Sequence, residues 1–257
     1  MTLRLLRSAV VLLGVLLTGG CSTAGGESRT PVADSTDLGS PPQGHELSAA
    51  LVSRLLDSTV HVRGLDCKVA QNGSGFVVAG GLVATGAHVV AGIAAPTLVF
   101  SDTQTPTSSG HEVSSRVVAF DPVADLALLQ PLGAIDLPAP LALAEAVEGT
   151  VGVLLIHDGE RPLAIPALIS QRIRATGVDI YGEPANGRDA LVLVASVEMG
   201  YSGGAVVDTA GGVVGITFSR TRGGRPIAYA VQSTELTRLM EGIGQDPVAS
   251  GRCRDTD

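Results

Sequence analysis

The segment Gly200-Tyr201-Ser202-Gly203-Gly204 places a serine among glycines, directly before an apolar run. Glycine permits backbone conformations closed to other residues, so the chain can turn sharply around Ser202 and expose its hydroxyl. The N–H groups of Gly200 and Ser202 can then point at one spot and stabilise an oxyanion. An ordinary glycine-rich turn between strands has the same pattern, so this chemistry requires a base and an acid elsewhere in the chain.

His88 and Asp125 are the candidates for that base and acid. His88 directly follows an apolar strand, where it can present one ring nitrogen to a site while the other nitrogen needs an acceptor. Asp125 opens the apolar run Leu126–Leu129, and a carboxylate buried there needs a partner such as His88. The alternative for Asp125 is a plain turn acid. The other histidines are more simply surface or structural residues: His45, His61, His111 and His157.

Chain order decides between two classes of serine hydrolase. The serine segment also fits the G-x-S-x-G turn of α/β-hydrolases, but that fold requires a histidine after the serine. His157 is the last histidine of the chain, so the esterase interpretation fails. No spacing of His, Cys and Asp resembles a metal site, and we expect no metal and no cofactor.

The composition favours an all-β protein that does not bind nucleic acid. The 257 residues are 45% hydrophobic and include 33 Gly and 14 Pro, and valine is frequent. These features favour short strands with tight turns. The net charge of −8 comes without a visible basic patch, which argues against nucleic-acid binding. Lys68 is the only lysine, a bias typical of a GC-rich genome such as an actinobacterial one.

The first 45 residues have the features of an export signal and a tether. Residues 1–20 combine two arginines with an apolar stretch too short to span a bilayer comfortably, which predicts a signal peptide of the lipoprotein type. Cys21 would carry the lipid, and residues 21–45 would form a flexible tether. We therefore expect a lipid-anchored or secreted protein on the outer face of the cytoplasmic membrane or in a periplasm-like space. Plain cleavage and an uncleaved anchor are the alternatives.

The two other cysteines, Cys67 and Cys253, lie near the start and at the end of the expected folded region. In an exported protein such a pair is most simply a disulfide. Two unpaired buried thiols are the alternative.

The strand pattern divides the remaining chain into two β-rich halves, 46–132 and 133–257, joined by a proline-rich stretch. Helices are expected at 46–56 and 233–240, the second capped by Ser233. Too few residues follow Gly244 for an additional substrate-recruiting domain. Strands are expected at 59–63, 75–78, 82–85, 97–100, 112–119, 126–130, 151–156, 163–174, 178–181, 190–197, 205–208, 213–219 and 227–232.

Four segments in this order resemble the trypsin-like serine proteases, of the bacterial HtrA/DegP type and especially of the mycobacterial MarP type. The resemblance covers about residues 59–253 and implies two six-stranded antiparallel β-barrels with a catalytic cleft between them. The segments are Gly73-Ser74-Gly75-Phe76-Val77-Val78, Thr85-Gly86-Ala87-His88-Val89-Val90, Asp125-Leu126-Ala127-Leu128-Leu129 and Gly200-Tyr201-Ser202-Gly203-Gly204.

The resemblance implies an exported serine endopeptidase that acts on proteins or peptides through an acyl-enzyme intermediate. Ser202 would be the nucleophile, His88 the base and Asp125 its orienting acid, with Gly200 and Ser202 forming the oxyanion hole. Tyr201 stands where the family usually has Asp or Asn and leaves open whether that hole is preformed. A catalytically weak or inactive binding protein of the cell envelope is the alternative. Three residues would line the substrate pocket: Ser196, Phe218 and Ser219.

Overall fold

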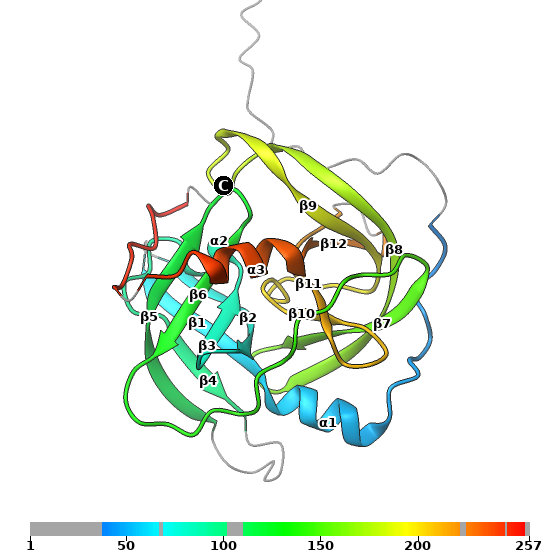
Figure 1. The fold of residues 1–257 in the computed structure, drawn as a ribbon, viewed down its shortest axis with the longest axis horizontal. Helices are drawn as coiled ribbons and strands as arrows, with labels where there is room; N and C mark the ends of the chain where they lie inside the picture. The colour runs from blue at the N-terminus through cyan, green and yellow to red at the C-terminus, as the bar shows by residue number, and fades with distance from the viewer. Residues whose placement is uncertain (1–37, 67–68, 102–109, 222–224, 245, 255–257) are drawn as a thin grey trace, which may run out of the picture.

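The computed structural model describes residues 38–66, 69–101, 110–221, 225–244 and 246–254, which form two closed antiparallel barrels (Figure 1). The expected all-β architecture of two six-stranded barrels is confirmed. The first barrel is built from β1 (Thr59–Asp66), β2 (Val69–Val78), β3 (Leu82–Thr85), β4 (Thr97–Phe100), β5 (His111–Asp121) and β6 (Leu126–Pro131). The second is built from β7 (Thr150–His157), β8 (Pro162–Val178), β9 (Pro184–Val194), β10 (Ala205–Val207), β11 (Val213–Arg220) and β12 (Ile227–Gln232).

The two barrels have the same strand connectivity. Neighbouring strands in the first barrel follow the order β1-β2-β3-β6-β5-β4, and β4 pairs with β1 to close it. The second barrel follows the order β7-β8-β9-β12-β11-β10, and β10 pairs with β7. Full closure leaves neither barrel with an unpaired sheet edge.

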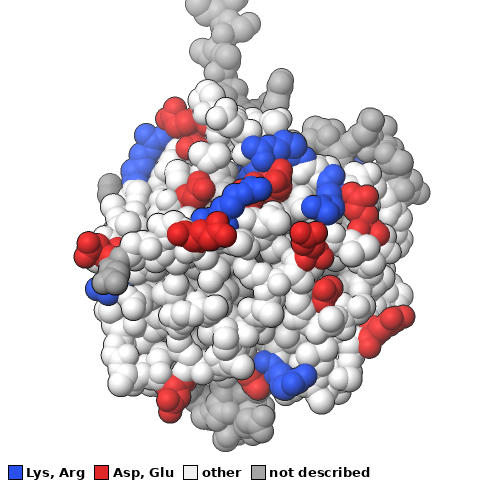
Figure 2. Space-filling view, in the orientation of Figure 1, with Lys and Arg blue, Asp and Glu red and all other residues white. Residues whose placement is uncertain are grey.

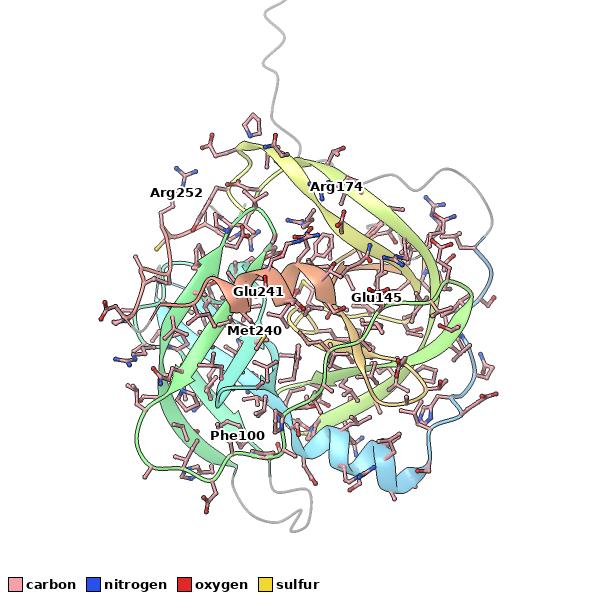
Figure 3. All side chains as sticks on the ribbon, in the orientation of Figure 1. Phe100, Glu145, Arg174, Met240, Glu241 and Arg252 are labelled. Atoms are coloured by element: carbon pink, nitrogen blue, oxygen red, sulfur yellow. The ribbon has the colours of Figure 1, made fainter. Side chains whose placement is uncertain are left out.

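Strand alternation explains why several strands are apolar without interruption. Successive side chains of a strand point to opposite faces. On β6, Leu126 and Leu128 pack between the two barrels, whereas Ala127 and Leu129 fill the first barrel. Strand β7 repeats this arrangement, with alternate residues in the shared core and in the second barrel. Figure 3 shows side chains filling both barrels. Because both faces of these strands are buried, the two barrels share one hydrophobic core where they meet.

Three short helices accompany the barrels. In α1 (Ala49–Asp57), the Ser48 hydroxyl accepts a hydrogen bond from the Leu51 N–H, which caps the helix. The helix α2 (Ala87–Val90), not expected from the sequence, directly follows β3. Helix α3 (Ser233–Glu241) was predicted, but its expected cap is wrong: Gln232 is the N-cap, and the Ser233 hydroxyl instead donates to the Ala144 carbonyl.

The long hairpin β8–β9 reaches from the second barrel to the first. The strand expected at 178–181 is wrong, because Asp179 accepts hydrogen bonds from the N–H groups of Tyr181 and Glu183 and closes a turn. The Ile180 N–H of this turn donates to Pro122 of the first barrel at 3.2 Å. The hairpin therefore contacts the segment that leads to Asp125.

Ion pairs tie α3 to the same hairpin. Arg174 on β8 pairs with Asp189 on β9 at 2.9 Å, and Arg238 on α3 lies 3.7 Å from the Asp189 carboxylate. Within α3, Arg238 also pairs with Glu235 at 2.7 Å. On the face drawn in Figure 2, basic and acidic side chains are interspersed. These pairs help to fix the hairpin over the boundary between the barrels.

The expected signal peptide, the lipid-bearing Cys21, most of the tether and Cys67 lie outside the described residues. Residues 102–109, between β4 and β5, also lie outside the described residues. Among the residues that the structure describes, no helix is long and apolar enough to cross a membrane. The predicted boundaries of the two halves, 46–132 and 133–257, stay predictions.

Candidate active site

Asp125 sits at the end of a tight turn before β6, in a left-handed conformation. Its φ of 61° is the only positive value at a non-glycine residue in the described part of the chain. Asp is among the few residues that tolerate this conformation. The turn is held by Asp121, whose carboxylate accepts hydrogen bonds from the N–H groups of Val123 and Ala124 at 2.8 and 2.9 Å. The resulting backbone buries the Asp125 carboxylate, which is 5% exposed.

His88 lies on α2 directly against this carboxylate. Its Nδ1 is 2.9 Å from Oδ1 and 2.8 Å from Oδ2 of Asp125, and its backbone N–H donates to Oδ1 at 2.9 Å. A Cβ at Gly86 would come within 3.2 Å of Nδ1, so the glycine leaves room for the ring. With Nδ1 donating to Asp125, the other ring nitrogen is free to accept a proton.

The loop that carries Ser202 is held by both barrels. The Ser74 N–H of the first barrel donates to the Ser202 carbonyl at 2.7 Å, and the Gly203 N–H donates to Thr217 of the second at 2.7 Å. Gly203 has a φ of 84°, and a side chain there would overlap Ser74 and Thr85. Only glycine fits this position, which places the serine at the junction of the barrels.

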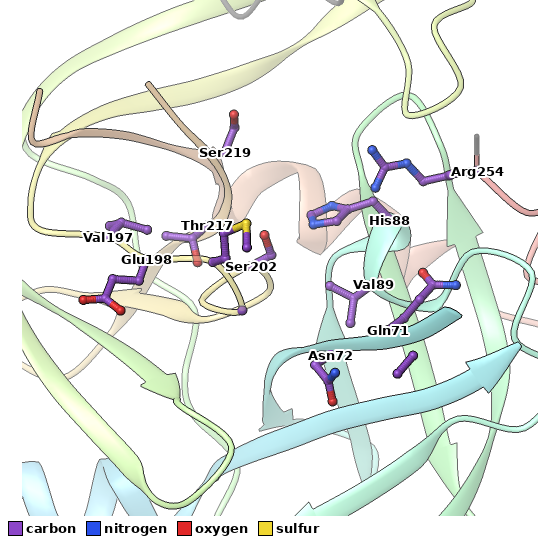
Figure 4. Close-up of a pocket in the computed structure, with 13 residues that line it drawn as sticks. Gln71, Asn72, His88, Val89, Val197, Glu198, Ser202, Thr217, Ser219 and Arg254 are labelled. Carbon is purple, nitrogen blue, oxygen red and sulfur yellow. The ribbon is translucent and has the colours of Figure 1, made fainter. Parts of the chain in front are cut away.

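Ser202 and His88 line one cleft of about 470 Å³ between the barrels (Figure 4). The imidazole ring and the serine hydroxyl face each other across it. No hydrogen bond joins Ser202 Oγ to His88 among the described residues. In proteases without substrate this contact is often long and shortens when substrate binds. The structure thus brings together the three residues expected to act as nucleophile, base and acid.

The two expected oxyanion donors are available to a ligand. Gly200 lines the cleft with Ser202, and neither of their N–H groups donates a hydrogen bond within the described part of the chain. An N–H without a protein partner at the wall of a cleft can bind an oxygen of a substrate.

Tyr201 anchors this loop through packing. Its half-buried side chain packs against the hydrophobic core of the second barrel. Burial and the nearby carboxylate of Glu198 raise the pKa of the phenol, so it stays neutral. Its carbonyl accepts hydrogen bonds from Thr217 Oγ1 at 2.9 Å and from the Gly204 N–H at 3.2 Å. Tyr201 therefore fixes the loop without the ion pair that an acidic residue would form.

Arg188 is a half-buried cation near the site that the sequence did not indicate. Its guanidinium donates to the Val123 carbonyl at 2.7 Å and stacks on the Phe218 ring at 4.2 Å. Burial lowers its pKa, and the Asp125 carboxylate is the main opposing influence. Because Val123 belongs to the turn that carries Asp125, Arg188 stabilises that turn and balances its buried charge.

The three residues expected in the substrate pocket separate in the structure. Ser219 lines the cleft with Ser202. Phe218 packs in the core between the barrels, facing Tyr229 with ring centroids 6.2 Å apart. Ser196 is exposed and lines a neighbouring hollow of about 200 Å³, together with Arg225. That hollow shares Val197 and Glu198 with the cleft.

A second serine–histidine contact lies where the barrels meet. The His157 ring stacks on His61 at 5.0 Å, and its Nε2 lies 2.9 Å from Ser101 Oγ. The Gly159 N–H donates to Nδ1 at 3.0 Å, so Nε2 carries the proton of the neutral ring and donates to Ser101. This histidine cannot act as a base toward Ser101, and the pair is structural. Among the described residues, no group of three or more metal-binding side chains occurs.

The buried His157 predicts a loss of stability in acid. Burial, and secondarily the charge of His61, lower the pKa of His157 to about 4 from its ordinary value of 6.5. Between these values the unfolded chain binds a proton that the folded protein does not, so the free energy of unfolding falls as pH falls. This group alone should remove about 2 kcal/mol between pH 7.5 and pH 5.

Urea unfolding at both pH values measures this effect. His157→Asn keeps an acceptor for the Gly159 N–H but cannot titrate, so it should lose about 2 kcal/mol less than the wild type. The exposed His111→Asn is the matched control and should retain the wild-type loss. An unchanged pH dependence in His157→Asn would contradict this assignment.

Two antiparallel barrels with a Ser-His-Asp arrangement at their junction define a chymotrypsin-like protein. The trypsin-like peptidase domain matches residues 73–216, and the chain belongs to this family. It is 32% identical over 231 residues to serine protease Rv3671c of Mycobacterium tuberculosis, covering 88% of this chain and 55% of that protein. It is also 28% identical to mitochondrial serine protease HTRA2 of Bos taurus, over 84% of this chain and 48% of that protein. The chain therefore spans about half the length of these relatives.

Solved structures support the same placement. The active form of Rv3671c protease from M. tuberculosis superposes with a TM-score of 0.74 at 32% identity, covering 89% of this chain and 98% of that one. An inactive form of the same protease gives a TM-score of 0.63 at 31% identity, covering 84% and 100%. The HtrA-type protease AlgW with a tripeptide gives 0.63 at 25% identity, covering 75% and 62%. Rv3671c is the mycobacterial protease MarP, so the expected resemblance to the HtrA and MarP types of protease is confirmed.

Proposed function

We propose that this chain is an exported serine endopeptidase in which Ser202, His88 and Asp125 form the catalytic triad. Ser202 Oγ attacks the scissile carbonyl, and His88 takes its proton and then delivers it to the leaving amine. Asp125 holds the imidazole in the required tautomer and stabilises its protonated form. The N–H groups of Gly200 and Ser202 bind the oxyanion of the tetrahedral intermediate. Water then hydrolyses the acyl-enzyme by the same steps.

The observation that carries this proposal is the contact of His88 Nδ1 with both oxygens of Asp125, in a cleft that Ser202 shares. The available N–H groups of Gly200 and Ser202 favour a site that is ready for substrate.

A fluorophosphonate probe tests the proposal, because it reacts with a serine only when a base activates the hydroxyl. We expect labelling of the folded chain on Ser202 and none in Ser202→Ala. The probe should also fail to label Ser202 in His88→Ala.

A protease-fold binding protein without hydrolysis is the second candidate. The observation in its favour is the missing hydrogen bond between Ser202 Oγ and His88 among the described residues. Absence of labelling in the folded protein, together with tight binding of peptides, would support this candidate over the enzyme.

We also propose a disulfide between Cys67 and Cys253. Cys67 lies between β1 and β2, and the Gln71 side chain of that hairpin donates to Ala91 at 3.0 Å. The segment before Cys253 reaches the same region, since the Gly92 N–H donates to the Ser250 carbonyl at 3.0 Å. Gln71, four residues after Cys67 in the sequence, and Ser250, three residues before Cys253, thus contact neighbouring residues of the first barrel.

Cys253→Ser should lower the melting temperature by about 10 °C, because a bridge across so long a loop contributes about 4–5 kcal/mol in the chain-entropy model. Cys67→Ser should give the same fall, and the double variant no further fall. Peptide mapping without reductant should recover the two cysteines as one linked pair. Recovery of both as thiols would refute the bridge.

We propose export and a lipid anchor at Cys21, with residues 1–20 as the signal peptide. The support is the sequence itself and the similarity to a "probable periplasmic serine endoprotease DegP-like" of Brucella suis. That protein is 32% identical over 184 residues, covering 68% of this chain and 33% of its own length. The site would then face substrates outside the cytoplasm.

A further inference from the structure

The C-terminal segment 248–254 crosses from the first barrel to the tip of the β8–β9 hairpin. On the first barrel, the Val248 N–H donates to Val117 at 2.9 Å and the Ser250 carbonyl accepts from Gly92 at 3.0 Å. Gly251 then turns with a φ of 74°, and a side chain there would overlap the Tyr181 hydroxyl. Glycine at this position lets the segment pass close to the hairpin.

Two arginines secure the far end of this segment. Arg252 stacks on the Tyr181 ring at 4.7 Å and pairs with Glu183 at 3.0 Å. Figure 3 places Arg252 on this segment, beside the first barrel. Arg254 donates from Nε to the Ile180 carbonyl at 3.1 Å. These contacts on both barrels fix the place of Arg254.

Arg254 lines the same cleft as His88 and Ser202. Figure 4 shows its guanidinium directed toward the side of the cleft that carries His88. Of the described residues that line the cleft, Glu198 is the only acidic one, and it lies on the wall formed by the second barrel. The positive charge of Arg254 therefore lies on the side of the candidate site that carries His88.

Within the part of the chain that the structure describes, the Arg254 guanidinium has no acidic partner. Of its donors only Nε is used within the described part of the chain, which leaves the two terminal nitrogens available. The acidic residues of the adjacent turn are already engaged, because Asp179 accepts from the N–H groups of Tyr181 and Glu183, and Glu183 pairs with Arg252. A planar guanidinium with free donors is well suited to bind a carboxylate through two hydrogen bonds.

We propose that Arg254 is a specificity-determining residue that binds an Asp or Glu side chain of the substrate close to the scissile bond. This inference rests on the proposed endopeptidase function. The net charge of the chain is −8, so an acidic peptide gains little attraction from the rest of the protein. The preference for acidic substrates should therefore depend on this one cation.

Matched peptides measure the preference directly. Sites cleaved by the purified full chain in a complex peptide mixture are resynthesised as pairs that differ only by Glu against Gln, or Asp against Asn, within three residues of the cleaved bond. In the wild type we expect kcat/KM to be about 10-fold higher for the acidic member at one such position. In Arg254→Gln the ratio should fall to about 1. Arg254→Lys should retain part of the preference, because a point charge remains without the planar geometry.

Arg54→Gln is the matched control, since it removes the same charge from an exposed position on α1. It should keep the wild-type ratio and the wild-type melting temperature. The melting temperature of Arg254→Gln should fall by no more than about 3 °C, because this variant loses only the hydrogen bond to Ile180. A ratio of about 1 at every position in the wild type, or an unchanged ratio in Arg254→Gln, would overturn the inference. If one of these two results is found while the fluorophosphonate probe still labels Ser202, only the role of Arg254 is refuted. Loss of labelling itself would refute the proposed function.

Discussion

Ser202→Ala should lower kcat/KM for peptide hydrolysis by about 10⁶-fold, because it removes the atom that attacks the scissile carbonyl. The residual rate would come from substrate binding and the oxyanion donors, which the substitution leaves in place. The serine side chain makes no hydrogen bond among the described residues, so the melting temperature should not change. Initial rates on a quenched fluorescent peptide and a thermal scan measure both quantities.

The control for this prediction compares the activity losses of the single variants with that of the double variant. His88→Ala should cost about as much as Ser202→Ala, and the double variant should be no slower than either one, because the two residues act as a unit. Independent, multiplicative losses would mean that His88 does not activate Ser202. A Ser202→Ala variant with more than about 1% of wild-type activity would assign the nucleophile elsewhere.

Asp125→Asn should lower kcat/KM by about 10⁴-fold while the fold persists. Both carboxylate oxygens of Asp125 face Nδ1 of His88, at 2.9 and 2.8 Å. An amide can donate to Nδ1, which favours the tautomer whose proton lies on the nitrogen that must accept one from Ser202. Asparagine tolerates the φ of 61° at this position, so the turn before β6 should form normally. Hydrolysis rates and the melting temperature, compared with the wild type, give both results.

Asp125→Ala separates the backbone role from the chemical one. Alanine lacks the acceptor for the His88 N–H and is strained at positive φ, so this variant should lose stability as well as activity. Near wild-type kcat/KM in Asp125→Asn would contradict the role of the carboxylate. A melting temperature of Asp125→Ala equal to that of Asp125→Asn would contradict the role of the turn.

The sequence predicted the short strands and the two β-rich halves because the physical signals that set them are local, whereas the six-stranded barrels were expected from the family resemblance. Leu126–Leu129 and most of β7 are short, continuously apolar runs that end at turn residues. Such runs are typical of strands that are buried on both faces. The serine loop was predictable for the same reason, since its glycines are required by conformation at Gly203 and lie next to the nucleophile in the chain.

Features set by distant contacts were not predictable. The segment at residues 178–181 has the composition of a strand, yet Asp179 turns the backbone there and the Ile180 N–H donates to Pro122 of the first barrel. Phe218 was expected in the substrate pocket, yet its neighbours Thr217 and Ser219 line the cleft while its own ring faces the shared core. Arg188 and Arg254 carry no local signal, because tertiary contacts alone bring them to the site.

Detection of the acyl-enzyme tests most directly the central claim that His88 and Asp125 activate Ser202 for nucleophilic attack. The folded protein is mixed with a 4-nitrophenyl ester, nitrophenolate release is followed in time, and the quenched protein is analysed by intact mass and peptide mapping. We expect a burst of one nitrophenolate per chain and one acyl group on Ser202. Both should be absent in Ser202→Ala and His88→Ala. Steady release without a burst or adduct, or an adduct on another residue of the folded chain, would contradict it.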